Sequence, residues 1–392
     1  MKLLVLAQTP PPVHGQSIMA QTLVDGLAQA ANASASADAS ASADANASAS
    51  RIEVHHINLA LSRTAADIGR PRPAKLLALL RACARAFLHR TRHLRAPITL
   101  YYIPAPAKRA ALYRDWLAML LLRPFFTNLV LHWHASGLGE WLATEATAPE
   151  RWLTRLLLGR AALSIVLAPE LADDAQLLRP RKLAIVPNGL PAPFSIPEYK
   201  LHPAPIRLLY LGSCTREKGL FAALDALAFL NGDTESHAAY YHLTIAGAFP
   251  DPAEERAFRA RLAATPALGQ TITYDGPADE PRKHALYTDA DIFIFPTHYA
   301  HEAQPLVLIE ALAHDLRIVT TRWRAIPDML PALPQIQLVS PAAMPQQLAA
   351  AIRAARAAGP ANGALRAHYE AHFTRDAHLS ALAEALRQAC PD

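Results

Sequence analysis

Two glutamates separated by seven residues, Glu302 and Glu310, are the residues whose type and spacing first suggest chemistry. Their carboxylates can accept hydrogen bonds from the hydroxyl groups of a sugar. Glu302 lies in a predicted loop, residues 297–304, that leads into a helix whose first position suits Pro305. A helix N-terminus attracts anions, so one interpretation of the pattern is a site for a ligand with both phosphate and sugar. The structural alternative makes Glu302 a helix-start charge and Glu310 a solvated helix residue.

The elements that must position these glutamates form a predicted strand–helix–strand unit. Residues 291–295 are apolar and aromatic, and residues 317–321 are rich in β-branched side chains, as expected of buried parallel strands. The helix between them is predicted from an apolar face at Leu306, Ile309, Leu312 and Ala313. Ligands of open α/β sheets bind outside the carboxyl ends of the strands, so the loop that contains Glu302 is expected at the ligand crevice.

A second loop, residues 212–219, follows the predicted strand 207–211 and carries the cations Arg216 and Lys218. It reads Gly-Ser-Cys-Thr-Arg-Glu-Lys-Gly, which matches neither the Walker sequence nor G-x-G-x-x-G. This argues against a P-loop enzyme and against a dinucleotide-dependent oxidoreductase. Cations at the end of a strand suit the phosphates of a ligand.

The first half of the chain offers a glycine and two histidines at the ends of predicted strands. Residues 2–7 are predicted to form a strand, followed by a proline-rich turn and a helix over residues 17–30. Gly15 in that turn either lets the backbone approach a ligand or simply forms a tight turn. His132 and His134 come at the carboxyl end of a further predicted strand, where a histidine is either a ligand contact or a satisfied structural residue.

Two other segments differ in composition from their surroundings. Residues 31–50 are a low-complexity run of Ala, Ser, Asp and Asn that offers little to a core, so a surface loop is predicted. Residues 74–95 are a basic helical stretch without an acid, and one face carries Leu76, Leu80, Cys83 and Phe87. This helix is expected either to pack on the sheet with a solvated basic face or to lie on an anionic membrane.

Composition sets the broad class of the protein. A chain of 392 residues with 52% hydrophobic residues is predicted to form two domains. No apolar run reaches a transmembrane length, and the N-terminus lacks the apolar core of a signal peptide, so a cytoplasmic location is expected. Three dispersed cysteines indicate neither a disulfide framework nor a cysteine-rich metal site. The net charge of +5 fits an anionic ligand, a membrane surface or nucleic acid without choosing among them.

Taken together, the motifs resemble the signature of retaining glycosyltransferases of family 4, in the family's order along nearly the whole chain. The resemblance rests on the glutamate pair, on Lys218-Gly219, on Asn188-Gly189 before a linker and on His134. It implies an α/β GT-B fold, in which two Rossmann-like domains have parallel sheets that face each other across an interdomain cleft. The N-terminal domain would span residues 1–190, the linker 191–205 and the C-terminal domain 206–366, and a helix in residues 367–392 would cross back to the first domain.

The resemblance also implies roles for individual residues. The catalytic residues would be His134 and Glu302. His134 would contact the donor sugar, and Glu302 and the backbone amides after it would bind the donor sugar and phosphate. Glu310 would bind the ribose hydroxyls. The residues that bind the donor nucleotide and its diphosphate would be Gly15, Gly212, Ser213, Arg216, Lys218, Gln304, Pro305, Leu306 and Glu310. Ser213 stands where the family has an arginine, and Arg216 is the candidate replacement for that charge.

The function implied is transfer of a sugar, with retained configuration, from a nucleoside-diphosphate sugar to a saccharide or lipid-linked acceptor in cell-envelope polysaccharide or glycan synthesis. No metal or other cofactor is expected, because cations and helix N–H groups stabilise the leaving diphosphate. The expected partners are the donor, the acceptor and an anionic membrane at residues 74–95, at the inner face of the plasma membrane, with no nucleic acid. The alternatives are a GT-B nucleotide-sugar epimerase or hydrolase and a non-catalytic protein that binds sugar nucleotides.

Overall fold

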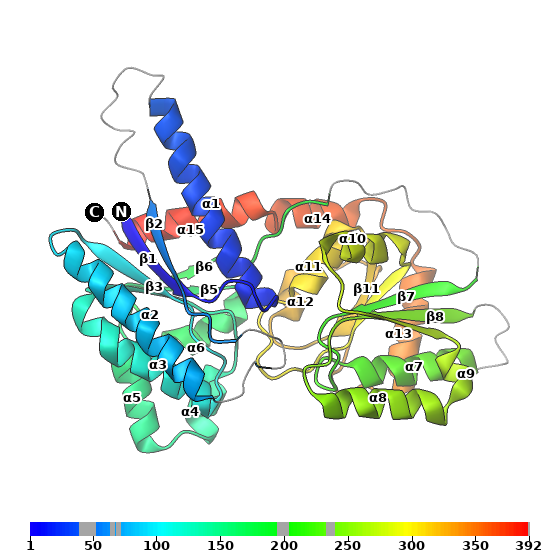
Figure 1. Cartoon of the computed structure of the whole chain (residues 1–392). Coiled ribbons are helices and arrows are strands. Elements are labelled where there is room, and N and C mark those ends of the chain that lie inside the picture. The colour runs from blue at the N-terminus through cyan, green and yellow to red at the C-terminus, as the bar shows by residue number, and fades with distance from the viewer. Residues whose placement is uncertain (39–51, 63–66, 68–71, 194–203, 233–239, 391–392) are drawn as a thin grey trace. The chain divides into compact units, whose positions relative to one another are not determined.

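The computed structural model describes residues 1–38, 52–62, 67, 72–193, 204–232 and 240–390, with side chains along the first helix up to residue 29. The chain divides into two compact units (Figure 1). Unit 1 comprises Met1–Gly189 and Arg375–Asp392, and unit 2 comprises Leu190–Thr374. Each unit is built on its own parallel sheet.

Unit 1 contains a six-stranded parallel sheet in the order β2-β1-β3-β4-β5-β6. The central strands are apolar and buried on both faces, as parallel strands covered by helices must be. The strands are β1 (Lys2–Ala7), β2 (Glu53–Asn58), β3 (Ile98–Tyr102), β4 (Asn128–His132), β5 (Leu163–Val166) and β6 (Lys182–Ile185).

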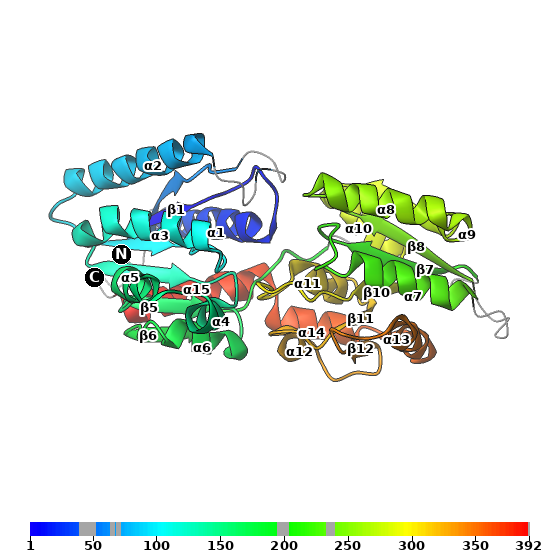
Figure 2. The same cartoon turned by 90° about the horizontal axis from the view of Figure 1, so that it is seen from below.

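Helices cover both faces of this sheet (Figures 1 and 2). On one face, α1 (Gly15–Asp38) and α15 (Arg375–Ala389) contribute Leu23, Leu27, Leu382 and Leu386 to a core shared with β1. The other face carries α2 (Pro73–Arg92), α3 (Arg109–Leu122), the 3-10 turn η3 (Arg123–Phe125), α4 (Leu138–Thr144), α5 (Ala148–Leu158) and α6 (Ala172–Gln176). A second 3-10 turn, η4 (Pro169–Leu171), precedes α6.

The predicted loop at residues 31–50 is wrong for its first part, because α1 continues to Asp38. The reason is intrinsic propensity: alanine is the best helix former, so an alanine-rich run extends a helix that has already been nucleated. The helix also begins at Gly15 rather than at residue 17. Residues 39–50 of the predicted loop lie outside the described residues.

The apolar face predicted for α2 is not the face that the helix buries. The buried residues are Leu79, Ala82, Cys83 and Ala86. Of the predicted set only Cys83 is buried, while Leu76, Leu80 and Phe87 are 50%, 41% and 40% exposed. Small residues allow close packing on the neighbouring elements, so the large side chains are left facing solvent on a helix with five basic residues and no acid.

Unit 2 also contains a six-stranded parallel sheet, in the order β12-β11-β10-β7-β8-β9. Its strands are β7 (Ile206–Leu211), β8 (Tyr241–Ala246), β9 (Ile272–Gly276), β10 (Ile292–Phe295), β11 (Arg317–Thr321) and β12 (Ile336–Val339). The helices are α7 (Leu220–Gly232), α8 (Pro252–Ala264), α9 (Pro266–Gly269), α10 (Glu280–Asp289), α11 (Leu306–Ala313), α12 (Ile326–Met329), α13 (Pro345–Ala357) and α14 (Ala364–His372).

The chain passes between the units twice, after Gly189 and after Thr374. Residues 194–203 of the predicted linker lie outside the described residues. The predicted tail, residues 367–392, is divided between the units: α14 (Ala364–His372) lies wholly in unit 2, and α15 belongs to unit 1. Asp315 explains why α14 stays with unit 2, since its carboxylate accepts hydrogen bonds from the Gly363, Leu365 and Arg366 amides at 2.7, 3.0 and 3.1 Å.

Candidate functional site

The two loops singled out in the sequence follow neighbouring strands of unit 2, since β7 pairs with β10. The amide of His298 donates to the carbonyl of Glu217 at 2.8 Å, which ties the loops together. Gly219 has φ +85°, and a Cβ there would lie 2.2 Å from the carbonyl oxygen of Pro296. Glycine at this position is therefore a requirement of the close approach between the two loops.

Lys218 and Glu302 form an ion pair where these loops meet. The Nζ of Lys218 lies 2.6 Å from Oε2 of Glu302, and their side chains are only 21% and 8% exposed. Thr297 Oγ1 donates to the same carboxylate oxygen at 3.1 Å, and the ammonium lies 4.5 Å from the centroid of the Tyr299 ring. Burial, together with the charges of Glu302 and Glu217, raises the pKa of Tyr299 to about 12, so this tyrosine remains a neutral phenol.

Glu310 is held by two partners on α10. Its Oε1 accepts a hydrogen bond from Lys283, and its Oε2 accepts one from the Tyr287 hydroxyl at 2.9 Å. Burial raises the pKa of Glu310, while the charge of Lys283 opposes that rise. The side chain is 14% exposed, so the alternative of a solvated helix residue is wrong. Lys283 was missed in the sequence because lysine on an amphipathic helix gives no signal of a tertiary partner.

Two histidines, His284 and His314, lie beside Tyr287 and the backbone of Glu310. The Nδ1 of His314 lies 2.7 Å from the carbonyl oxygen of Glu310 and must therefore donate. Burial lowers the pKa of His314 to about 4, so its Nε2 is a neutral acceptor for His284 Nδ1 at 2.9 Å. The ring of His314 also stacks on Tyr287, with centroids 4.9 Å apart. These contacts fix Tyr287 against Glu310.

The start of α11 differs from the prediction by one residue. Pro305 is the N-cap, with φ −66° and ψ 119°, and the helix begins at Leu306. Gln304 is buried, with 7% exposure, and Leu306 is half-buried. The helix is almost wholly buried rather than amphipathic, since Leu308 and Ala311 are enclosed as well as the predicted Ile309 and Leu312.

Arg216 has partners of its own in unit 2. Its guanidinium lies 4.1 Å above the ring of Phe221 and 3.9 Å from a carboxylate oxygen of Glu254, and the side chain is 62% exposed. Ser213 is exposed, and its carbonyl accepts a hydrogen bond from Tyr210 at 2.9 Å. Gly212, the residue before it, has φ +152° and faces the ring of Phe295. An exposed pair at 3.9 Å is weak, so Arg216 can exchange Glu254 for another anion.

In unit 1, His134 belongs to a cluster of histidines beyond the end of β4. Its ring lies 4.1 Å from that of His132, which is 1% exposed and bonded through Nδ1 to the Tyr101 hydroxyl. Burial, reinforced by the charges of His378 and His14, lowers the pKa of His134 to about 3. His134 is therefore neutral at physiological pH. His132 is the structural member of the pair and His134 the more accessible one.

His378 completes this cluster and was missed in the sequence because it lies 244 positions beyond His134. Its Nδ1 lies 2.6 Å from the carbonyl of Pro187 and must donate, so its buried Nε2 is an acceptor. Within the described residues, neither this atom nor Nε2 of His132 has a hydrogen-bond partner. The tail helix α15 thus contributes a polar group to the same end of unit 1.

Several other residues of unit 1 have structural contacts of their own. Gly15 is exposed and opens α1, and the buried Ser17 hydroxyl donates to the carbonyl of Pro12 at 2.8 Å. Two arginines of α3 are committed to acids of unit 1: Arg109 to Glu150 and Arg114 to its neighbour Asp115. In the described part of the chain, no three His, Cys, Asp or Glu residues converge to hold a metal ion.

The sequence of unit 2 is similar to that of a known protein family. Residues 205–357 match the family described as Glycosyl transferases group 1. The match lies within unit 2 and includes both loops and both glutamates. It supports sugar transfer as the activity. No curated protein sequence matches the chain.

Solved structures resemble the whole chain. Sucrose-phosphate synthase from Thermosynechococcus elongatus is 19% identical, with a TM-score of 0.70 and 99% of each chain covered. A lipopolysaccharide outer core galactosyltransferase is 13% identical, with a TM-score of 0.65 and the same coverage. Anabaena HepE in complex with UDP-glucose is 15% identical, with a TM-score of 0.66, and the match covers 98% of this chain and 99% of that one. With the two parallel sheets, these likenesses show that the chain has the GT-B fold.

Proposed function

We propose that the protein is a retaining glycosyltransferase of family 4 that moves a sugar from a nucleoside-diphosphate sugar, bound by unit 2, to a saccharide or lipid-linked acceptor, bound by unit 1. The observation that carries the proposal is the pairing of each signature glutamate with a lysine, Glu302 with Lys218 and Glu310 with Lys283. The family match over unit 2 supports it. Synthesis of cell-envelope polysaccharide or glycan is the pathway that we assign.

Donor binding begins with an exchange of ion partners at Lys218. A diphosphate carries more negative charge than one carboxylate, so it competes with Glu302 for the ammonium. Glu302 is then released to accept hydrogen bonds from the donor sugar, next to the amides that follow it in the chain. The ion pair thus holds both groups in place before the donor arrives.

Glu310 would bind the ribose of the nucleotide. Lys283 and Tyr287 each occupy one of its carboxylate oxygens, and each oxygen retains a lone pair for a ribose hydroxyl. The charge of Lys283 favours the ionised carboxylate, which accepts stronger hydrogen bonds than a neutral acid.

During transfer, positive charge develops at the anomeric carbon and negative charge on the departing diphosphate. Lys218 stabilises the leaving group, with Arg216 as the second cation, because fixed charges are most effective where charge develops. The neutral His134 would contact the sugar. We assign no metal to this reaction, because the two cations supply the charge; chelation with EDTA should therefore leave the rate unchanged.

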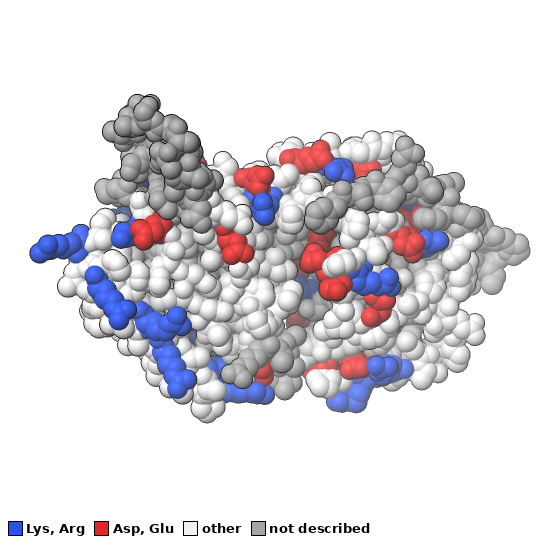
Figure 3. All heavy atoms as spheres, turned by 45° about the horizontal axis from the view of Figure 1, so that its top comes forward, with Lys and Arg blue, Asp and Glu red and all other residues white. Residues whose placement is uncertain are grey.

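Membrane contact through α2 belongs to the same proposal. Leu76, Leu80 and Phe87 are exposed beside basic residues on this helix. Figure 3 shows a row of Lys and Arg without acids along the lower left margin of unit 1, where α2 lies. An amphipathic basic helix of this kind binds anionic lipid surfaces. None of the described helices has the length and apolarity needed to cross a bilayer.

The test is donor binding followed by transfer. Thermal shift with UDP-, GDP- and ADP-sugars identifies the base, and UDP-glucose is the first choice because HepE was solved with it. Product from the matching donor and a saccharide acceptor, with the anomeric configuration read by NMR, would complete the assignment. Equal hydrolysis with and without acceptor would contradict transfer, and no shift with any donor would contradict donor binding.

A further inference from the structure

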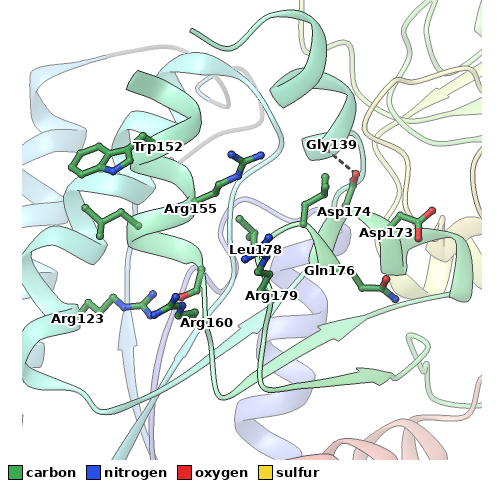
Figure 4. A pocket seen from close by; sticks show the side chains of 13 residues that line it. Arg123, Gly139, Trp152, Arg155, Arg160, Asp173, Asp174, Gln176, Leu178 and Arg179 are labelled. Atoms are coloured by element: carbon green, nitrogen blue, oxygen red, sulfur yellow. Dashed lines mark hydrogen bonds between the residues drawn. The ribbon is translucent and has the colours of Figure 1, made fainter. Parts of the chain in front are cut away.

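Unit 1 contains a cavity of about 1140 Å³ that the proposed sugar transfer does not use. It lies between α5, α6 and the turns that precede β5 and β6 (Figure 4). Its lining includes four arginines, contributed by four different segments: Arg123, Arg155, Arg160 and Arg179.

Three of these arginines have no counter-ion among the described residues. Within the part of the chain that the structure describes, Arg155, Arg160 and Arg179 form no ion pair, and all three are exposed. Arg123 is anchored by hydrogen bonds from its guanidinium to the carbonyls of Leu157, at 2.7 Å, and Gly159. Figure 4 shows the side chains of Arg123 and Arg160 side by side. Like charges held together in this way favour an anion between them.

The acids of the cavity do not neutralise this charge. Both oxygens of Asp174 are used by the backbone amides of Gly137, Leu138 and Gly139, at 2.7, 3.0 and 2.8 Å. Asp173 lies on the far side of Arg179 from Arg123 and Arg160 in Figure 4. The part of the cavity nearest α5 is therefore strongly basic.

Arg160 and Arg179 occupy unusual backbone positions. Their φ angles are +55° and +49°, a region in which glycine is free of strain and arginine is not. Glycine at either position would therefore be tolerated by the fold.

The rim of the cavity is apolar and faces solvent. Trp152 and Leu156, both on α5, are 62% and 52% exposed. On the neighbouring α3 and η3, Leu120 and Phe125 are 61% and 45% exposed. Phe125 packs edge-on against Phe87 of α2, with ring centroids 4.7 Å apart, so this apolar surface continues onto the exposed face of α2.

We propose that this arginine cavity binds the phosphate headgroup of an anionic phospholipid when unit 1 docks on a membrane. The arginines match the charge and the hydrogen-bonding geometry of a phosphate. Exposed Trp and Leu beside a basic cavity suit the boundary between headgroups and acyl chains, where an aromatic ring is stable. A purely soluble phosphate ligand would give no reason for the apolar rim. The inference does not depend on the sugar transfer proposed above.

The test is sedimentation of the full chain with vesicles of phosphatidylcholine alone and of phosphatidylcholine mixed equally with phosphatidylglycerol. The pocket variant combines Arg155→Gln, Arg160→Gly and Arg179→Gly, which remove charge and relax two strained positions. Each basic residue near an anionic surface contributes about fivefold, so binding to the anionic vesicles should fall about 100-fold. Trp152→Ser should weaken the binding on its own.

A matched control removes the same charge from unit 2. This α8 variant combines three substitutions on α8: Arg256→Gln, Arg259→Gln and Arg261→Gln. It should bind anionic vesicles as tightly as the wild type does. The single variant Arg155→Gln, on an exposed helix surface, should show the fivefold loss even if the triple variant fails to fold. UDP-sugar binding should be the same in all of them, so that loss of membrane binding is distinguished from failure of the proposed sugar transfer.

Two outcomes would overturn the proposal. Equal vesicle binding by the wild type, the pocket variant and Arg155→Gln would show that the cavity holds no lipid phosphate. Inorganic pyrophosphate that raises the melting temperature of the wild type but not of the pocket variant, with vesicle binding unchanged, would assign the cavity to a soluble phosphate instead.

Discussion

The two units carry similar parallel sheets, but they hold the polar groups at the ends of their strands in opposite ways. Unit 2 uses charge: Lys218 with Glu302 and Lys283 with Glu310 are ion pairs that remain partly accessible. Unit 1 uses neutral rings: His132 and His378 are buried, His134 is half-buried, and all three have lowered pKa values. A site built on charge suits a diphosphate, whereas a neutral, weakly polar one suits sugar hydroxyls.

The largest effect on this contrast should come from removing the central cation of unit 2. Lys218→Ala should cost about 3 to 4 kcal/mol of transition-state stabilisation, the scale of losing one preorganised electrostatic group, read from kcat/KM. It also leaves Glu302 buried without its partner, so the double variant with Glu302→Gln separates catalysis from stability. If Lys218→Ala turned over normally, the ion pair would be structural.

Glu310→Gln should come next. The amide is uncharged and has one acceptor oxygen instead of two, so binding of the free nucleoside diphosphate should weaken by about 1.5 to 3 kcal/mol in titration calorimetry. Glu280→Gln is the matched control, because Glu280 also contacts Lys283 at 3.0 Å but is 78% exposed. Unchanged affinity in Glu310→Gln would show that its carboxylate only holds Lys283 in place.

The histidines of unit 1 should make stability depend on pH. The pKa of His134 is lowered from 6.5 to about 3 by burial, so the unfolded chain binds a proton that the folded one does not between these values. Stability should be complete above pH 6.5 and fall as the pH drops toward 3, by up to about 1.4 kcal/mol per pH unit for each such histidine. The free energy of unfolding of His134→Gln, measured by denaturant melts at several pH values, should depend less steeply on pH than that of the wild type. An unchanged pH dependence would mean that His134 is not buried in solution.

His134 and His132 should differ in what their loss affects. His134→Ala should lower turnover by up to about tenfold, the value of one neutral hydrogen bond, while nucleotide affinity holds. His132→Ala should instead lower the melting temperature, because it leaves the Tyr101 hydroxyl in a buried site without its partner. The reverse pattern, with His132 needed for turnover and His134 dispensable, would place the ligand contact two residues earlier.

Arg216→Ala should give the smallest effect. The side chain is 62% exposed and solvent screens its charge, so we expect a loss of about 1 kcal/mol in kcat/KM, about fivefold. Adding Ser213→Arg should restore the rate if the two positions supply the same charge. Glu254→Gln, which frees Arg216, should not lower the rate. A wild-type rate in Arg216→Ala would leave Lys218 as the main cation for the leaving group.

Local pattern alone was sufficient for the strands and for the class of fold. The run at residues 317–321 is confirmed as β11, and the apolar runs at residues 2–7 and 207–211 are β1 and β7. Buried parallel strands must be continuously apolar, so each one is visible without its neighbours. The order of motifs along the chain was likewise sufficient to predict the GT-B fold.

Only the tertiary structure decided which side chains meet. Lys283 reaches Glu310 from another helix, and His378 joins His134 across more than half of the chain, so no local pattern contains either contact. The buried face of α2 depended on its neighbours, which admit Ala82 and Ala86 and leave Leu80 outside. The length of α1, by contrast, depends on a local property of the sequence. The helix propensity of the alanines in residues 31–38 extends α1 to Asp38, although this segment has few apolar side chains to bury. Local interactions determine whether a segment forms a helix or a strand. The contacts and burial of its side chains depend on residues far away in the sequence, which only folding brings close.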